Sequence, residues 1–233
     1  MNSTEASNSV YSDTAKADEP PRNAAIYPAI RIKELCERDR RRLLMHFLAL
    51  AESDRMLRFG TVLPDELITR YVQRLDFARD TIFGVYDNAL NLVAVGHLAF
   101  APREAFPAVS GTTLREQVVE FGVSVSEFAR GMGIGTKLFE RAAIHCRNAG
   151  VDTLYVHCLA SNQAMMHIAK KAGMTINQGH GEADAYLHVP PPSACSVLHE
   201  AVNEQVATFD FTIKENAQAA SKWLGNFPRF KLG

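Results

Sequence analysis

The chain has 233 residues, 47% of them hydrophobic, and a formal net charge of −1 at pH 7. This composition suffices for one well-packed domain, and the near-neutral charge creates no field that would attract nucleic acid or an anionic membrane. The sequence holds no run of about 18 apolar residues, the length of a membrane span, and no apolar signal-peptide core. We expect a cytoplasmic protein that acts on small molecules, with neither nucleic acid nor a membrane as its partner.

The cysteines and histidines indicate no metal site. The four cysteines form no CxxC pair, which fits a reducing compartment. The eight histidines form no HxxxH pair and no close Cys/His cluster, so we predict no zinc.

The first 25 residues are rich in Ser, Asn, Ala, Asp and Glu and carry few large apolar groups, so we expect a disordered tail over residues 1–25. The folded domain is expected over residues 26–189. Up to residue 100 its predicted elements are a strand over Ala29–Leu35, a helix over Asp39–Ala51, a helix from Pro64 to about Leu75, and a hairpin of strands Thr81–Tyr86 and Leu92–Phe100.

The segment 118–135 reads VVEFGVSVSEFARGMGIG and predicts a strand followed by a glycine-rich helix entrance. Apolar residues alternate from Val119 to Val125, as in a strand with one apolar face. Beyond the glycines the apolar residues recur at helical spacing. The unpaired N–H groups and the dipole at such a helix start favour phosphate oxygens.

Spacing excludes two nucleotide-binding motifs. From Gly131 the chain reads Gly-x-Gly-x-x-Thr, and from Gly133 it reads Gly-x-Gly-x-x-Leu, so neither frame gives the GxGxxG of a dinucleotide site. Lys137 is not preceded by glycine, so the GxxxxGK of a Walker loop is absent as well. What remains is Arg-x-x-Gly-x-Gly at Arg130, Gly133 and Gly135.

This motif resembles the pyrophosphate-binding loop of the GNAT superfamily of acyl-CoA-dependent N-acetyltransferases. The similarity continues in a strand over Thr153–Ala160 and a helix over Asn162–Ala172 that begins with an asparagine and is closed by Gly173-Met174. It covers about residues 28–189 in order.

The resemblance implies a fold and a co-substrate. The fold would be of the α/β (α+β) class, a mixed and mostly antiparallel central sheet flanked by helices, ending in a strand pair over Met174–Val189. The co-substrate would be acetyl-CoA, with no metal. The residues expected to bind it are Val123, Val125, Arg130, Gly131, Met132, Gly133, Ile134, Gly135, Thr136 and Asn162.

For the chemistry, the resemblance points to Glu120 as the base that accepts the amine proton, directly or through water. The alternative is a strand-edge carboxylate that only binds a loop. The Val125 N–H would donate to the thioester carbonyl. Many members carry a tyrosine that protonates the leaving thiolate, but this chain has Ala169 there, so His157 and His167 are considered as displaced donors beside water.

The sequence leaves the acceptor open. Arg55, Arg58 and Phe59 from the early helices and Glu182 from the last hairpin are expected to line the substrate site. Acidic groups such as Glu182 would hold the ammonium of a polyamine or aminoglycoside, whereas Arg55 and Arg58 would hold the carboxylate of an amino acid or peptide. Each could equally belong to a solvated charged rim.

After Pro190-Pro191-Pro192, apolar residues recur at steps of three and four, which predicts a helical extension over residues 190–233. These residues are Leu198, Val202, Val206, Phe209, Ile213, Ala217, Ala220 and Leu224. A helix of about 30 residues would be about 45 Å long. It would pack over the sheet as a lid or form a homodimer.

We therefore predict an N-acetyltransferase that transfers an acetyl group directly from acetyl-CoA to a primary amine of a small molecule or peptide. Two alternatives stand beside it. One is a catalytically silent CoA-binding or sensing module of the same fold, and the other is an interaction scaffold built on the C-terminal helix.

Overall fold

The computed structural model describes residues 30–100 and 117–225, so the predicted tail over 1–25 lies outside the described residues. The elements in chain order are β1 (Ile32–Glu34), α1 (Arg40–Leu48), α2 (Glu52–Phe59), α3 (Asp65–Arg74), β2 (Thr81–Tyr86), β3 (Leu92–Phe100), β4 (Val118–Val125), α4 (Ile134–Asn148), β5 (Thr153–Leu159), α5 (Gln163–Lys171), β6 (Thr175–Gly179), β7 (Glu182–His188) and α6 (Ala194–Gly225). Short 3₁₀ turns precede α1 and α4.

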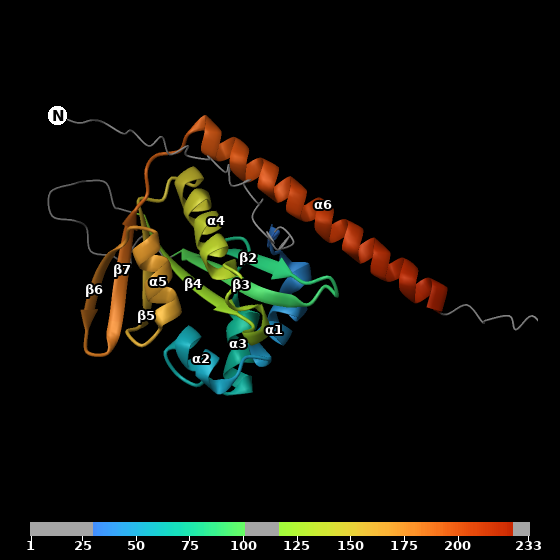
Figure 1. The fold of residues 1–233 in the computed structure, drawn as a ribbon, viewed down its shortest axis with the longest axis horizontal. Coiled ribbons are helices and arrows are strands. Elements are labelled where there is room, and N and C mark those ends of the chain that lie inside the picture. Colours follow the sequence, from blue (N-terminus) through green and yellow to red (C-terminus); the bar gives the residue numbers. More distant parts are fainter. Residues whose placement is uncertain (1–29, 101–116, 226–233) are drawn as a thin grey trace, which may run out of the picture.

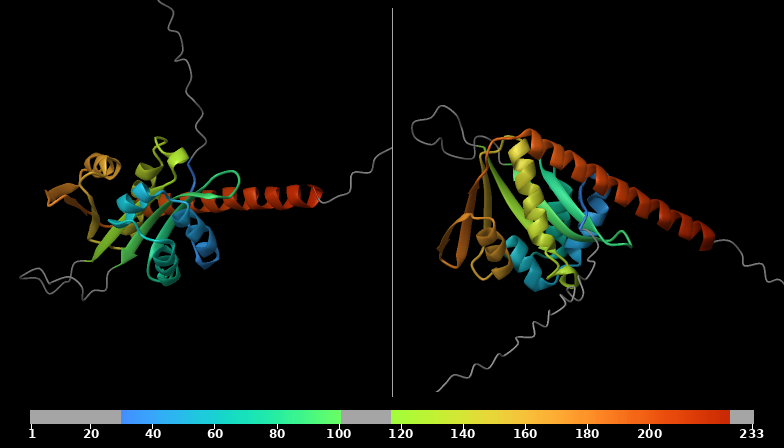
Figure 2. Two further views of the ribbon diagram at one scale, coloured as in Figure 1. Left: turned by 90° about the horizontal axis from the view of Figure 1, so that it is seen from below. Right: turned by 45° about the horizontal axis from the view of Figure 1, so that its top comes forward.

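The strands form a seven-stranded sheet in the order β1-β2-β3-β4-β5-β7-β6 (Figure 1). Neighbouring strands are antiparallel except β4 and β5, which are parallel. Helices cover both faces, α4 and α5 on one and α1 to α3 on the other (Figure 2). The prediction of a mixed, mostly antiparallel sheet flanked by helices is confirmed.

Alternation along β4 divides the core between the two faces. Val119 and Phe121 are buried and belong to the larger apolar cluster, together with Leu138 of α4. The opposite face carries a smaller cluster in which Phe47 of α1 and Ile68 of α3 pack on the sheet. The central strand is therefore apolar on the side of α4 and carries polar groups on the other.

The early helices differ from the prediction. The helix expected over Asp39–Ala51 ends at Leu48, and a separate helix, α2, follows before α3. The sequence analysis predicted no helix there; α2 has only eight residues, and none of them is fully buried.

The first half of α6 packs across β1 and α4, and its far end extends beyond the domain (Figures 1 and 2). Arg141 of α4, which is 4% exposed, pairs with Glu200 and with Glu204. His145 and Asn148 of α4 also donate to Glu200. Burial alone would raise the pKa of Glu200, but these hydrogen bonds hold it at about 2. Charge pairing therefore docks the helix.

A buried histidine ties α1 to the sheet. The Nδ1 atom of His46 lies 3.0 Å from the carbonyl oxygen of Leu92, and its Nε2 atom lies 2.8 Å from the hydroxyl of Ser124 on β4. A carbonyl can only accept, so Nδ1 carries the proton and Nε2 accepts from Ser124. Burial, opposed by the bond to Leu92 and aided by the charge of Arg58, lowers the pKa of His46 to about 4.

This histidine predicts a pH-dependent stability. Between pH 6.5 and 4 the unfolded chain binds a proton at residue 46 that the folded chain excludes, so stability falls as the pH falls through that window. The loss attributable to His46 should approach about 3 kcal/mol. The variant His46→Gln lacks this titration, so its free energy of unfolding should change less between the same two pH values. Urea unfolding of both proteins measures the difference, and equal pH dependence would contradict the assignment.

Candidate active site

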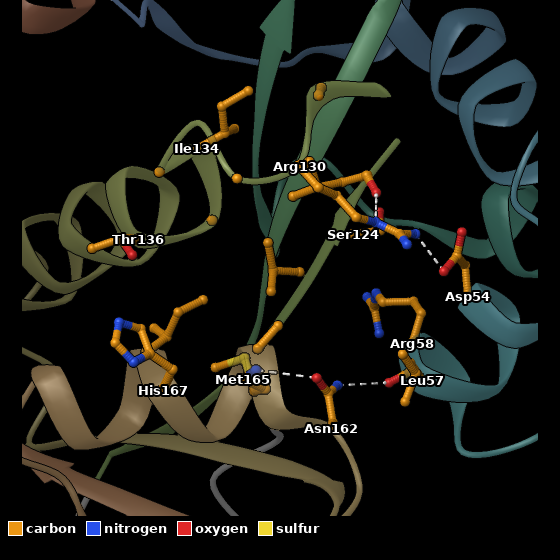
Figure 3. A pocket seen from close by; sticks show the side chains of 18 of the residues that line it. Asp54, Leu57, Arg58, Ser124, Arg130, Ile134, Thr136, Asn162, Met165 and His167 are labelled. Atoms are coloured by element: carbon orange, nitrogen blue, oxygen red, sulfur yellow. Dashed lines mark hydrogen bonds and ion pairs between the residues drawn. The ribbon is translucent and has the colours of Figure 1, made fainter. Parts of the chain in front are cut away.

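A cavity of about 600 Å³ opens between the end of β4, the start of α4, α5 and α2. Figure 3 shows residues on its walls. Its lining comprises Leu50, Asp54, Leu57, Arg58, Val123, Ser124, Val125, Ala129, Arg130, Gly131, Gly133, Ile134, Gly135, Thr136, Asn162, Ala164, Met165, His167, Ile168 and Lys171. We refer to it as the first cavity.

The glycine-rich loop forms one end of the first cavity. Gly131 and Gly133 have φ values of +74° and +76°, and a Cβ added to either would meet no atom within 4 Å. Gly133 precedes the first residue of α4, and no side chain caps the helix there. The first N–H groups of α4 therefore have no capping side chain, and a ligand can approach the backbone there closely. This arrangement suits a phosphate.

Two predicted loop residues differ in their placement. Arg130 lines the first cavity, forms a short ion pair with Asp54 of α2, and donates through Nε to the Val125 carbonyl at 3.3 Å (Figure 3). Met132 does not line the first cavity, and 42% of its surface is exposed to solvent. The side chain of Met132 therefore lies outside the cavity wall, so this residue could reach a ligand there only through its backbone.

Strands β4 and β5 separate along the cavity. Their parallel pairing covers Val118 to Glu120 and ends there, while β4 remains paired with β3 to Val125. The N–H of Ser126 bonds to Val93 of the β3 side, so alternation turns the N–H groups of Val123 and Val125 toward the gap that β5 leaves. These two donors point into the opening between the strands.

A second cavity, of about 480 Å³, lies on the other side of that opening. Its lining comprises Leu57, Arg58, Phe59, Gly60, Thr61, Glu120, Phe121, Gly122, Val123, Val156, His157, Cys158, Leu159, Asn162, Met165 and Glu182. Five residues line both cavities: Leu57, Arg58, Val123, Asn162 and Met165. The two cavities therefore meet where β4 and β5 part.

Polar groups gather at the β5 and β7 side of the second cavity. His157 Nδ1 donates to Asp184 at 2.9 Å, and the Tyr155 hydroxyl donates to the same carboxylate oxygen at 2.5 Å. The hydrogen bond from Tyr155, and then that from His157, lowers the pKa of Asp184. The Nε2 atom of His157 lies 3.8 Å from Glu182. Asp184 thus fixes the ring that lines this cavity.

Arg58 stands at the junction of the cavities. Its Nη2 donates to the Tyr71 hydroxyl at 3.2 Å, and its guanidinium lies 5.1 Å from the centre of the Phe59 ring. Its Nε atom is buried and has no hydrogen-bond partner among the described residues. A Cβ added to Gly122 would come within 2.7 Å of the guanidinium carbon, so the glycine makes room for this charge.

Arg55 requires a correction. It donates to the carbonyl oxygens of Leu48, Leu50 and Leu63 at 2.8 to 3.0 Å and pairs with Asp65 at 2.7 Å. It lines neither of the two cavities. Its guanidinium binds carbonyl groups at the end of α1 and in the loops on either side of α2, so we do not retain Arg55 as a substrate residue.

Helix α5 supplies the remaining predicted residues. The Asn162 side chain accepts from the Met165 N–H at 3.1 Å and donates to the Leu57 carbonyl at 3.4 Å, which joins α5 to α2 (Figure 3). His167 lines the first cavity. Ala169 is 1% exposed and packs in the core, so its methyl group lines neither cavity.

The sequence analysis missed several residues of the site. The pairs Asp54–Arg130 and His46–Ser124 join segments far apart in the chain, and no local pattern indicates such contacts. The hydroxyl of Tyr71, which accepts from Arg58, lies 3.0 Å from Nδ1 of His97. This contact was missed for the same reason. Ser124 lies on the polar face of β4, yet it is only 8% exposed because His46 of α1 covers it.

Within residues 30–100 and 117–225, no group of three or more His, Cys, Asp or Glu side chains could hold a metal ion. The same part of the chain contains no helix long and apolar enough to cross a membrane.

Solved structures share this fold at low sequence identity. The GNAT domain of PAT from S. lividans has a TM-score of 0.55 and 17% identity, with 67% of this chain and 89% of that chain covered. An acetyltransferase of the GNAT family from Streptococcus pneumoniae has a TM-score of 0.53 and 14% identity, with coverage of 69% and 99%. Spermidine N-acetyltransferase from Vibrio cholerae, in complex with CoA and spermine, has a TM-score of 0.51 and 17% identity, with coverage of 69% and 95%.

A comparison with curated protein sequences gives no match. The family model of the Acetyltransferase (GNAT) family matches residues 46–174, which include α2, β4, β5 and the glycine-rich loop. The chain belongs to the GNAT acetyltransferase family.

Proposed function

We propose that the protein transfers an acetyl group directly from acetyl-CoA to a primary amine of a small molecule or peptide that carries further positive charge. The observation that carries this proposal is the meeting of two cavities where β4 and β5 part. A donor that enters from one side and an acceptor that enters from the other would meet there without a covalent enzyme intermediate. The residues around the junction supply the chemistry.

The first cavity suits acetyl-CoA. The α4 N-terminus and the unobstructed glycines would hold the pyrophosphate, and the apolar wall of Met165 and Ile168 would pack along the thiol-bearing arm. The N–H groups of Val123 and Val125 point into the gap and would donate to the thioester carbonyl, whose oxygen gains negative charge during transfer.

Glu120 is the proton acceptor we assign. It lies on the wall of the second cavity at the last paired position of β4 and β5. An amine must lose a proton to attack the thioester, and a carboxylate at this edge can accept it directly or through water. His157, whose Nδ1 proton is held by Asp184, presents Nε2 as a second acceptor in the same cavity.

Arg58 is the group we assign to the departing thiolate. The chain has Ala169 where a tyrosine would supply a proton, and Arg58 is the cation that lines both cavities. A guanidinium stabilises a developing negative charge without giving up its own proton. The proton that the thiolate takes up would then come from water or from the group that accepted the proton of the amine.

The acceptor class follows from the charges around the second cavity. Glu120 and Glu182 line it and Asp184 lies beside His157, whereas Arg55 is fully engaged elsewhere and Arg58 lies at the junction. A second ammonium on the acceptor would lie against this acidic end. We therefore favour a diamine, a polyamine or a lysine-bearing peptide over an acceptor recognised by its carboxylate.

The loop assignment predicts a selective loss of CoA binding in Gly133→Val. A β-branched residue at φ +76° is strained and blocks the approach to the α4 N-terminus, so CoA affinity should fall about tenfold or more. Gly150→Val is the matched control, because Gly150 has φ +72°, equally open surroundings and no place in either cavity. Calorimetric titration with CoA should show normal affinity in the control, and equal affinity in both variants would contradict the assignment.

The function predicts acetylated product from a panel of diamines, polyamines, lysine peptides and amino acids incubated with acetyl-CoA. Mass spectrometry of the product is the suitable measurement, because the exposed Cys36 and Cys195 would react with thiol reagents. Glu120→Gln should lower turnover about 100-fold while leaving CoA affinity nearly unchanged. CoA binding without product from any amine would support the silent sensing module instead.

Arg58 predicts a loss of turnover that leaves CoA affinity in place. Arg58→Met keeps an apolar stem over the Phe59 ring but removes the charge, so kcat should fall about 10- to 100-fold. Arg42→Met is the control, since Arg42 also lies over aromatic rings but lines neither cavity. An unchanged kcat in Arg58→Met would remove Arg58 from the proposed mechanism.

A further inference from the structure

The side of helix α6 that faces its own domain carries two glutamates and, further along, two apolar residues. Glu200 and Glu204 reach Arg141, and the carboxylate of Glu204 also accepts the N–H of Glu34 at 3.2 Å. Further along, Ala207 is 2% exposed and the Phe211 ring lies 4.8 Å from that of Tyr86. These positions follow one another at steps of three and four, so they define the docking side of the helix.

The opposite side of α6 carries large apolar residues in solvent, which we call the outer stripe. Its members and their exposed fractions are Leu198 66%, Val202 50%, Val206 38%, Phe209 68% and Ile213 52%. Most of them follow a docking residue by two positions, a rotation of about 200° around the helix, so they face away from the domain. This reverses the usual amphipathicity of a surface helix.

The outer stripe is long, straight and free of charge. Its steps of four, four, three and four repeat with a period of eleven, which keeps an apolar row nearly parallel to the helix axis. The positions that flank it are Ala201, Gln205 and Thr212 along one edge and His199 and Asp210 along the other, and the carboxylate of Asp210 is paired with Lys214. A continuous exposed apolar row of this kind marks an interaction surface.

We propose that the outer stripe binds the same stripe of a second copy of this chain, with the two α6 helices antiparallel about a two-fold axis between Gln205 and Val206. In that register Leu198 of each copy lies opposite Ile213 of the other, and Val202 lies opposite Phe209. Each large apolar residue at the ends of the row therefore meets another. An isologous interface needs this self-complementarity.

The charges of α6 distinguish this occupant from others. Residues 194–213 contain no Lys or Arg, which a helix that lies on an anionic membrane would carry along its polar side. Glu200 and Glu204 are paired with Arg141, and Asp210 is paired with Lys214 at 2.8 Å. Because these charges are paired within one chain, they are not available to attract an acidic or a basic peptide. A second copy of the chain, which presents the same uncharged stripe, is the occupant that fits.

The interface is separate from acetyl transfer. No residue of α6 lines either of the two cavities, and the helix packs on β1 and α4 rather than on α2 and α5. Loss of the interface should therefore leave CoA binding and turnover per chain unchanged, so failure of this proposal and failure of the proposed function are distinguishable.

The test uses sedimentation velocity on the full chain over a concentration series. The wild type should sediment with the mass of two chains, and Val202→Lys should sediment as one chain because it places a charge within the apolar row. Val197→Lys is the matched control, since Val197 is 52% exposed but lies off the stripe, and it should remain dimeric. Circular dichroism should give the same helix content for all three.

A charge exchange tests the register. In Val202→Lys combined with Phe209→Glu, each lysine lies opposite a glutamate of the other copy in the antiparallel register, so the dimer should return. In a parallel pair like charges would meet and the double variant would stay monomeric. A wild type that remains one chain throughout, a Val202→Lys dimer as stable as the control, or an unrestored double variant would each overturn the proposal.

Discussion

The separation of β4 from β5 after Glu120 is the constraint on which the rest of the site depends. A parallel pair that stayed closed would satisfy its backbone groups within the sheet and leave no passage between the two faces. Because the pair opens, the N–H groups of Val123 and Val125 face a gap rather than β5, and the two cavities share wall residues there. A glutamate at the last paired position is thereby placed at the edge of that passage.

The walls of the passage depend on α2, a helix in which no residue is fully buried. Helix α2 is held by polar contacts: Arg55 binds three backbone carbonyls, Asp54 pairs with Arg130, and the Leu57 carbonyl accepts from Asn162. Hydrogen bonds and ion pairs require a particular geometry, whereas apolar packing is less directional. These contacts therefore fix the position of α2 although the helix contributes little to the core. The same contacts connect the glycine-rich loop, α2 and α5 into one ring around the first cavity.

The elements predictable from the sequence are those in which local pattern and burial agree. The hairpin strands Thr81–Tyr86 and Leu92–Phe100 match the structure residue for residue, because two apolar and β-branched runs stand on either side of a turn-forming loop. The glycines at 131, 133 and 135 identify the loop because only a few backbone shapes need them. Helix α2, by contrast, is short and none of its residues is fully buried, and the role of Arg55 depends on carbonyls that come together only after folding. Local sequence patterns do not predict such contacts.

The docking of α6 shows why an apolar pattern alone does not say which side of a helix faces its own domain. The repeat starting at Leu198 predicts a helix correctly, but the natural inference that the apolar side packs inward is reversed here, since Glu200 and the buried Arg141 hold the polar side inward. Burying charges is costly unless each is well paired, and the three donors around Glu200 meet that requirement. The pKa of about 2 that results keeps the carboxylate ionised through the range in which His46 takes up its proton. The part of the stability loss that comes from His46 therefore originates where α1 meets the sheet, while Glu200 in the folded chain keeps the charge that docks the helix bearing the outer stripe.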